Sequence, residues 1–155
     1  MQKFAVFKIS DEKFAIAIER VVEILKMQKL FSIPGLPDFL SGVMNVRGTI
    51  VPIIDLRRRF GMKSSGGKKE RLIIVKFDKE KIGFHVDEIN EILTLEDQEI
   101  FKSPSIFKGF KTEYMTGLGK RDENIIILLN IDNVLTSEEK IILKESLESL
   151  EVKDA

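Results

Sequence analysis

The sequence predicts a mainly β fold of two related halves, each of small-barrel type, followed by a C-terminal helix. Three observations carry this prediction: the chain repeats itself, both copies are rich in short β-type runs separated by turn residues, and the last segment has a helical pattern. We expect a single domain over 1–155. Its first barrel should occupy residues 1–66, its second barrel 68–135, and a helix with a tail 136–155.

The repeat is clearest where Val6–Leu25 is laid without a gap over Ile74–Leu93, 68 residues further along. Six of these twenty positions are identical, whereas residue frequencies alone would give about one. The apolar positions also coincide. Further on, Ile50–Leu56 lies over Ile125–Ile131 after a small insertion. The period is too long, and the copies are too few, for a solenoid.

The first half begins with two predicted strands, Phe4–Ile9 and Lys13–Ile18, which flank a polar turn at Ser10–Glu12. Alternating apolar residues in the second strand share one face, which we expect to be buried. Glu19–Lys26 is short and apolar. Its pattern fits either a helical turn followed by a strand or a strand throughout, and periodicity does not decide between them.

The first half ends with a predicted hairpin and a short helix. Gly42–Val46 and Thr49–Ile54 are the strands of the hairpin, and Arg47-Gly48 is its turn, in which the glycine supplies a positive φ. Leu56–Phe60 is expected to form a short helix that ends at the next glycine. Residues 63–70, KSSGGKKE, are predicted to be a flexible linker or a loop tip.

The second half repeats this order of strands, after which the pattern becomes helical. The predicted strands are Leu72–Phe77, Lys81–Val86, Glu91–Leu95, Tyr114–Gly119 and Ile125–Asn130. Thr136 and Glu139 then form a capping box, and an apolar stripe follows at Ile142, Leu143, Leu147 and Leu150. Residues 137–150 are therefore predicted to form a helix that packs on the body. Because barrels of roughly 65 residues are marginal alone, the two should share a hydrophobic contact.

Composition excludes several kinds of site. The chain has no cysteine, which excludes disulfides, zinc ribbons, iron–sulfur clusters and thiol catalysis, and it has one histidine, which excludes two-histidine metal sites. The acidic pairs lack the spacing of a calcium loop. No apolar run approaches the length of a membrane span, and the N-terminus lacks a signal-peptide pattern. We expect a cytosolic protein without metal or cofactor.

The residues offer little that resembles a catalytic or nucleic-acid site. His85 lies between Phe84 and Val86, and we interpret it as a surface or satisfied imidazole. Lysine plus arginine equals aspartate plus glutamate, at 25 each, so the basic run Arg57–Arg59 lacks the net positive charge of a nucleic-acid binder. A non-enzymatic interaction module is favoured. An enzyme on a β-barrel scaffold and an oligonucleotide-binding barrel stay open as alternatives at this point.

One stretch is more specific than the rest. Gly42–Arg57 contains the pattern G-x-x-N-x-R-G-x-I-x-P-x-x-D-L-R, and this resembles the signature of the chemotaxis coupling protein family, the CheW-like proteins. Tyr114–Gly119 in the second half supports the resemblance, which extends from Phe4 to about Leu135. It implies two SH3-like five-stranded barrels packed on each other, and an adaptor without catalytic activity.

The resemblance also implies partners. Such an adaptor joins the cytoplasmic tip of methyl-accepting chemoreceptors to the regulatory domain of a chemotaxis histidine kinase. It is cytoplasmic, is recruited to membrane receptor arrays, does not insert into the membrane and binds no nucleic acid. An alternative is a coupling adaptor for a receptor–kinase pathway outside chemotaxis, such as surface motility or second-messenger control.

The same resemblance points to candidate partner-binding residues. Arg47 is the first, because its planar guanidinium suits bidentate recognition, and Asn45 lies beside it; both could instead serve only the hairpin turn. The remaining candidates are Val21, Glu23, Ile24 and Leu72. The two last are apolar residues of predicted strands and could equally belong to the core, and the glutamate could be a structural charge of the repeat.

Overall fold

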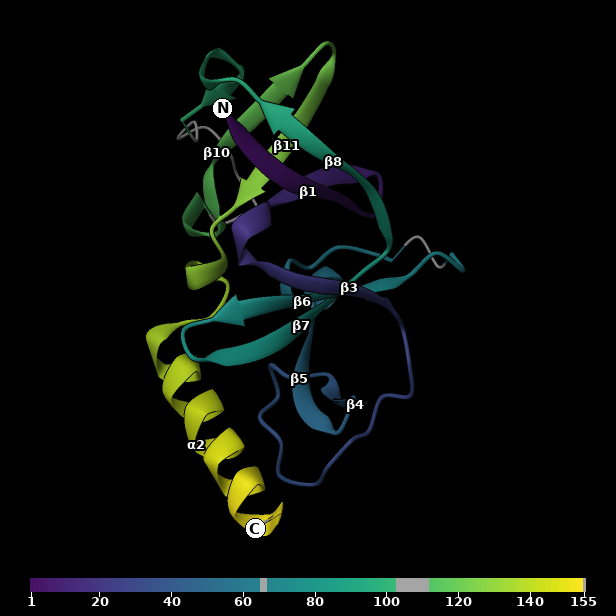
Figure 1. The fold of residues 1–155 in the computed structure, drawn as a ribbon, viewed down its shortest axis with the longest axis vertical. Helices are drawn as coiled ribbons and strands as arrows, with labels where there is room; N and C mark the ends of the chain where they lie inside the picture. The colour runs from purple at the N-terminus through teal and green to yellow at the C-terminus, as the bar shows by residue number, and fades with distance from the viewer. Residues whose placement is uncertain (65–66, 103–111, 155) are drawn as a thin grey trace.

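The structure, a computed structural model, describes residues 1–64, 67–102 and 112–154 (Figure 1). Its body consists of two β-sheets, one of six strands and one of five, and a long C-terminal helix lies along the second sheet. The predicted mainly β class, the two packed β subdomains and the C-terminal helix are confirmed.

We call the six-stranded unit barrel A and the five-stranded unit barrel B. Barrel A has the order β8-β1-β2-β11-β10-β9 and barrel B the order β3-β6-β7-β5-β4. The strands of barrel A are β1 (Gln2–Ile9), β2 (Glu12–Ala17), β8 (Glu88–Leu95), β9 (Ile100–Phe101), β10 (Met115–Arg121) and β11 (Asn124–Leu129). Those of barrel B are β3 (Val21–Lys26), β4 (Gly42–Val46), β5 (Thr49–Asp55), β6 (Arg71–Phe77) and β7 (Glu80–Val86).

The prediction that residues 1–66 form one barrel and 68–135 the other is wrong, because the two halves exchange strands. Barrel A combines β1 and β2 of the first half with β8, β10 and β11 of the second, and barrel B combines β6 and β7 with β3, β4 and β5. Two parallel pairings join the halves, β2 with β11 and β5 with β7. A repeat shows which strands are alike, but it does not show which strands are hydrogen-bonded neighbours.

The repeat itself is visible in the backbone. The β1–β2 and β6–β7 turns place Ser10 and Asp78 at φ 57° and 56°, and the β4–β5 and β10–β11 turns place Arg47 and Asp122 at φ 53° and 54°. The registers of β3 against β6 and of β8 against β1 shift at matching places. The two halves therefore share the irregularities of their strands as well as their sequence pattern.

The buried side chains form three apolar clusters. One fills barrel A around Phe4, Val6 and Leu128, and another fills barrel B around Met44, Ile53 and Leu72. The third lies between the barrels and under the helix; it includes Phe7, Phe14, Ile73, Val75, Phe84 and Val86. The expected hydrophobic contact between the two barrels is confirmed, because this third cluster contains buried side chains from both of them.

The short elements settle the questions that the pattern left open. Glu19–Lys26 contains a helical turn, η1 (Ile18–Arg20), followed by β3, which is the first of the two alternatives. The short helix is α1 (Leu56–Arg59), and Gly61 follows it with a φ of 67°. The remaining 3-10 turns are η2 (Asp97–Glu99), η3 (Thr112–Tyr114) and η4 (Ile131–Asn133). Ser65 and Gly66 of the predicted linker lie outside the described residues.

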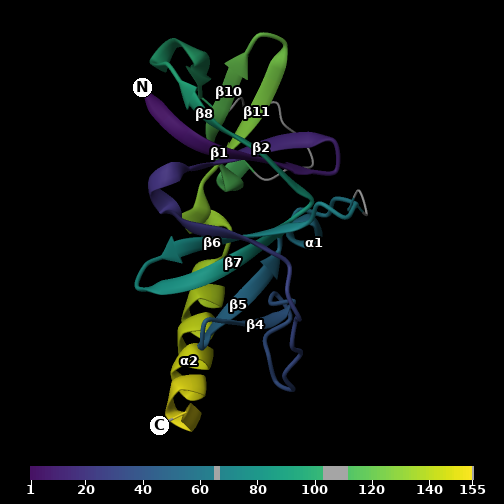
Figure 2. The ribbon, with the colours of Figure 1, turned by 45° about the vertical axis from the view of Figure 1, so that its right-hand side comes forward.

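The C-terminal helix, α2 (Ser137–Asp154), begins at the predicted capping box. The backbone N–H of Glu139 donates to Thr136 Oγ1 at 3.1 Å, and the backbone N–H of Thr136 donates to Glu139 Oε1 at 2.8 Å. Leu143 and Leu147 of the predicted stripe are buried in the cluster between the barrels, whereas the side chain of Leu150 lies outside the described part of the helix. Figure 2 shows α2 running beside barrel B.

Candidate partner-binding surface

The β4–β5 turn exposes Arg47 to solvent, and a side-chain hydrogen bond from within the turn holds its backbone. Arg47 and Gly48 have φ values of 53° and 85°, as a two-residue type I′ turn requires. The backbone N–H of Gly48 donates to Asn45 Oδ1 at 2.8 Å. Asn45 is therefore a turn-stabilising residue in this structure, with its side chain directed at the backbone and its surface exposed.

The guanidinium of Arg47 reaches across to β3 and pairs with Glu23. Its Nη1 lies 2.8 Å from Oε1 and 2.6 Å from Oε2 of the carboxylate. The arginine side chain is 72% exposed and the glutamate 24%. The two residues come from strands β3 and the β4–β5 hairpin, which lie at opposite ends of the strand order of barrel B. The pair thus ties the two edges of the barrel together at its surface.

Two more candidates lie on β3 beside this ion pair. Val21 and Ile24 are partly buried and pack against the apolar cluster between the barrels. In a regular strand, residues three apart point to opposite faces, but the register of β3 against β6 shifts between Val21 and Glu23. That shift places both apolar side chains toward the junction of the barrels and leaves Val22, 45% exposed, facing outward.

Leu72 does not reach this surface. It is fully buried inside barrel B, where it pairs with Leu25 across β3 and β6 and packs over Gly83. The structure therefore brings together Arg47, Glu23, Asn45, Val21 and Ile24 and places Leu72 beneath them. Of the two roles left open for this leucine, core and contact, the structure shows the core.

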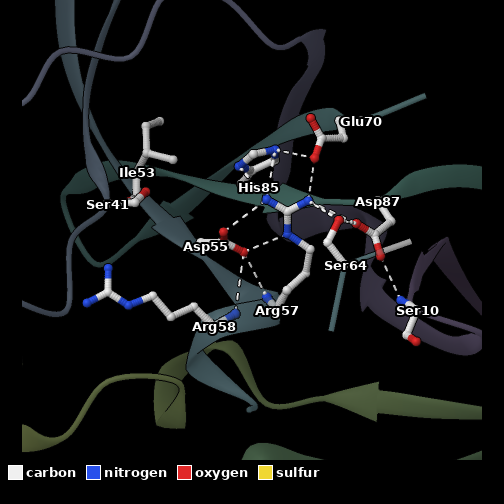
Figure 3. A network of polar contacts seen from close by, with 10 residues as sticks. All are labelled: Ser10, Ser41, Ile53, Asp55, Arg57, Arg58, Ser64, Glu70, His85 and Asp87. Carbon is white, nitrogen blue, oxygen red and sulfur yellow. Dashed lines mark hydrogen bonds and ion pairs between the residues drawn. The ribbon is translucent and has the colours of Figure 1, made fainter. Parts of the chain in front are cut away.

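A buried polar cluster lies nearby that the sequence analysis did not identify (Figure 3). At its centre is Arg57 on α1, whose side chain is 9% exposed. Its Nε and Nη2 donate to the two carboxylate oxygens of Asp55 at 2.8 and 2.9 Å, and its Nη1 donates to Asp87 Oδ1 at 2.9 Å. Nη1 also donates to Ser64 Oγ at 2.8 Å and to the carboxylate of Glu70. Both residues lie in the 63–70 segment.

His85 packs against the same guanidinium. Nη2 of Arg57 lies 3.2 and 3.3 Å from the two ring nitrogens, and Glu70 Oε1 lies 3.5 Å from Nε2. The imidazole is thus satisfied by neighbouring polar groups, which is how its sequence context was interpreted. No nucleophile among the described partners of this ring would give it the role of a general base.

The cluster perturbs the protonation of its members. Burial lowers the pKa of His85, and the positive charge of Arg57 lowers it further. Burial alone would raise the pKa of Asp55, but the hydrogen bonds and charge of Arg57 outweigh it and bring that pKa below its usual value. Hydrogen bonds to Asp55, Glu70 and Asp87 raise the pKa of Arg57 against the opposing effect of its burial. The guanidinium therefore stays charged in its buried position.

The signal for this cluster was present in the sequence but could not be interpreted there. Asp55 and Arg57 belong to the D-L-R end of the quoted motif, and Asp87 follows β7. A linear pattern does not show that a residue 30 positions away turns toward the same guanidinium.

The part of the chain that the structure describes has several open surface depressions. One of about 320 Å³ lies between α1 and the start of α2, and two of its three lining carboxylates, Asp55 and Glu139, are already paired with Arg57 and Arg59. Among the described residues, no group of acidic or histidine side chains is arranged to hold a metal ion. Within the same residues, none of the helices is both long enough and apolar enough to cross a membrane.

Comparison with known proteins gives the same picture across the chain. Residues 3–139 match the family model of the CheW-like domain. The chain is 37% identical over 139 residues to the chemotaxis protein CheW of Klebsiella aerogenes, covering 89% of this chain and 84% of that protein. It is 33% identical over 135 residues to the chemotaxis protein CheW of Rhizobium meliloti, with coverage of 86% and 87%.

A solved structure matches as well. The crystal structure of the scaffolding protein TtCheW from Thermoanaerobacter tengcongensis superposes with a TM-score of 0.79 at 32% identity, and the match covers 87% of this chain and 88% of that one. The likeness in sequence and in fold extends over both barrels and is not confined to one motif.

Proposed function

The chain belongs to the family of CheW-like domains, and on this premise we propose that it is a chemotaxis adaptor that couples receptors to a histidine kinase. The observation that carries the proposal is the extent of the match, which spans residues 3–139 and includes every fixed letter of the Gly42–Arg57 motif. An adaptor of this kind acts by binding, and the buried polar groups around Arg57 are engaged in structural pairs.

The surface around Arg47 supports a receptor-binding role. The guanidinium uses Nη1 for Glu23, and an arginine has five N–H donors in a planar fork. Donors therefore remain for carboxylates on a partner, and the ion pair with Glu23 orients them. Val21 and Ile24 pack toward the junction of the barrels, and the parts of these side chains that stay exposed add apolar surface on the same strand as Glu23. A receptor tip is a helical hairpin, and such a mixed surface suits an amphipathic helix.

The second partner in this proposal is the regulatory domain of the kinase. The family resemblance gives that domain the same two-barrel fold, so it can meet a barrel of this chain through a similar surface. Bound to both partners, the chain is recruited from the cytoplasm to receptor arrays without inserting into the membrane. It performs no catalysis and binds no nucleic acid.

Isothermal titration of the full chain against the kinase regulatory domain, alone and with a receptor-tip fragment, tests this proposal. We expect saturable one-to-one binding to the kinase domain with an affinity on the order of micromolar. Absence of heat at ~100 μM, with and without the receptor fragment, would reject the chemotaxis partner assignment. A titration against single-stranded oligonucleotide at low salt serves as the negative control.

A further inference from the structure

The chain passes between the two barrels at two crossovers, one after β2 and one after β7. It leaves barrel A through η1, between β2 and β3, and it returns from barrel B at Asp87, between β7 and β8. In the repeat these two crossovers occupy matching positions, with Glu19 at the place of Asp87. The two crossovers differ in how they are held: the return crossover by a buried charge, and the outward crossover by an exposed ion pair.

The return crossover is fixed by buried charge. The side chain of Asp87 is 1% exposed, and it accepts hydrogen bonds from Arg57 of barrel B at 2.9 Å and from the backbone N–H of Ser10 in barrel A at 2.7 Å. The backbone N–H of Asp87 also donates to the carbonyl of Lys8 in barrel A at 3.1 Å. An unbroken path of hydrogen bonds thus joins the two barrels through one carboxylate and one guanidinium (Figure 3).

The outward crossover is held at the surface. Arg20 donates to the carbonyl of Lys76, the repeat equivalent of Lys8, at 3.1 and 3.3 Å and pairs with Asp132 at 2.8 Å. The arginine and aspartate side chains are 30% and 59% exposed, and Glu19 is exposed as well. Solvent screens an ion pair of this kind, so it contributes little to the position of the barrels.

The large apolar cluster between the barrels favours their contact without fixing its angle, because hydrophobic attraction has no direction. A buried network with several fixed donors and acceptors is directional. Sliding one barrel over the other would break the hydrogen bonds that join Asp87 to Ser10 and Lys8 of barrel A, and the buried Asp87 carboxylate would lose a donor. The geometry at the return crossover therefore has the specificity that the apolar contact lacks.

We propose that Arg57 is a positioning residue, which through Asp87 sets the orientation of barrel A relative to barrel B. The partner surfaces that the two barrels carry are thereby held at one fixed angle. This last consequence rests on the proposed adaptor function, whereas the orientation itself does not.

The absence of cysteine from the sequence makes the test direct. Spin labels are attached to cysteines placed at Thr49 on β5 of barrel B and at Lys120 on β10 of barrel A, both exposed. Figures 1 and 2 show these two strands in different barrels. The distance distribution between the labels is measured by pulsed electron paramagnetic resonance. A second pair at Lys3 and Lys120, both in barrel A, serves as the control within one barrel.

In Arg57→Met we expect the distance between the labels at positions 49 and 120 to shift by about 2 Å or more, or its distribution to broaden. A shift of this size is typical of a domain rearrangement and exceeds that of a rigid protein. The distribution within barrel A should not change, and the matched variant Arg20→Met should leave both unchanged. An unaltered distance between barrels in Arg57→Met would overturn the proposal, even if the melting temperature falls, because Arg57 would then only stabilise the fold.

If Arg57→Met does not fold, the double variant Arg57→Met/Asp87→Asn also removes the buried negative charge that Arg57 balances. The same two outcomes of the distance measurement then decide. No partner is present in this experiment. Its result therefore stands whether or not the titrations with the kinase domain detect binding.

Discussion

Arg47 occupies a backbone conformation that glycine would adopt at lower cost. Its φ of 53° lies in the left-handed region, where a non-glycine residue costs on the order of 1 kcal/mol. Glycine follows at the next position and could have been used at both. The side chain that bears this cost is 72% exposed and pairs with Glu23. An exposed pair returns about 0–1 kcal/mol at most, so fold stability alone does not account for an arginine here.

Replacing Arg47 should therefore separate binding from stability. In Arg47→Ala we expect binding of the receptor-tip fragment to weaken about tenfold or more, as for a central arginine of an interface, while the melting temperature changes little. Arg47→Gly is the matched variant, because it relieves the strained φ. It should melt at or above the temperature of the parent protein and still bind as weakly as Arg47→Ala. Fluorescence anisotropy and calorimetry measure the two quantities.

A different result for these two variants would show that Arg47 has only a structural role in the turn. If Arg47→Gly restores binding to the parent level, the turn conformation matters and the guanidinium does not. Arg20→Ala removes another arginine that pairs with a carboxylate at the surface and controls for a general change of charge.

His85 makes stability depend on pH near neutrality. Its pKa in the folded protein lies below the ordinary 6.5, because it is buried and close to Arg57. The unfolded state therefore binds the proton more readily, and the free energy of unfolding falls as the pH is lowered through 6.5 toward the folded-state value. His85 is the sole histidine, and ordinary carboxylates titrate about two units lower, so this interval isolates it.

Urea denaturation at a series of pH values between about 7.5 and 5 checks this expectation. The parent protein should lose stability across the interval, and His85→Gln, which keeps a hydrogen-bonding side chain beside Arg57, should show a flatter profile. Equal slopes for the two proteins would mean that the imidazole has the same affinity for protons in the folded and unfolded states. Below this interval Asp55, whose pKa is also lowered, adds a further loss as it becomes protonated.

Strand β6 contributes Leu72 to the interior of barrel B, which is the core role that its apolar strand context left open. Leu72 is fully buried, and a Cβ added at Gly83 would lie 2.7 Å from its Cδ1, so the two residues fit against each other. Leu72→Ala should lower the free energy of unfolding by about 2–5 kcal/mol. Val22→Ala on the neighbouring strand β3, where the side chain is 45% exposed, should change it by less than about 0.5 kcal/mol.

Urea denaturation of both variants shows whether Leu72 acts through packing in the core or through direct contact with a partner. Weaker partner binding in Leu72→Ala should disappear once binding is expressed per folded molecule. A folded Leu72→Ala with parent stability and reduced affinity would contradict the assignment of this leucine to the core.

The elements could be predicted from the sequence, but their assembly could not. Turn residues and two-residue alternation located the hairpins, and Thr136 with Glu139 located the start of α2. The repeat predicted two barrels, yet strands of equivalent pattern are interchangeable partners in hydrogen bonding, so the exchange of strands was invisible. The family resemblance pointed to the candidate surface around Arg47, and its role in binding stays a prediction. The Arg57 cluster was not identified, because its members are spread from Asp55 to Asp87 and meet only when β5, α1 and β7 pack together.

For the whole molecule, the exchange of strands makes the two halves interdependent. A fragment of residues 1–66 would contain β1 and β2 of one barrel and β3, β4 and β5 of the other, and neither barrel would be complete. We expect this fragment to be unfolded by circular dichroism and the full chain to unfold in one cooperative transition. Mixing the fragment with residues 67–155 should restore β-structure. A separately folded 1–66 fragment would contradict the observed topology.

The interdependence of the barrels also has a functional side. An adaptor holds two partners at once, and a body in which each barrel depends on both halves of the chain cannot release one partner surface by unfolding half of the protein. The buried Arg57 cluster and the apolar contact between the barrels act together in this respect.

Coupling of receptor to kinase by this chain can be measured as receptor-dependent autophosphorylation of the kinase in a reconstituted mixture. Receptor fragments on vesicles, kinase and the full chain are combined, and phosphate incorporation is followed with the chain present, absent or replaced by Arg47→Ala. If the chain is the adaptor, kinase activity responds to receptor only when the chain is present, and Arg47→Ala reduces this response. Equal activity with and without the chain would contradict the adaptor function.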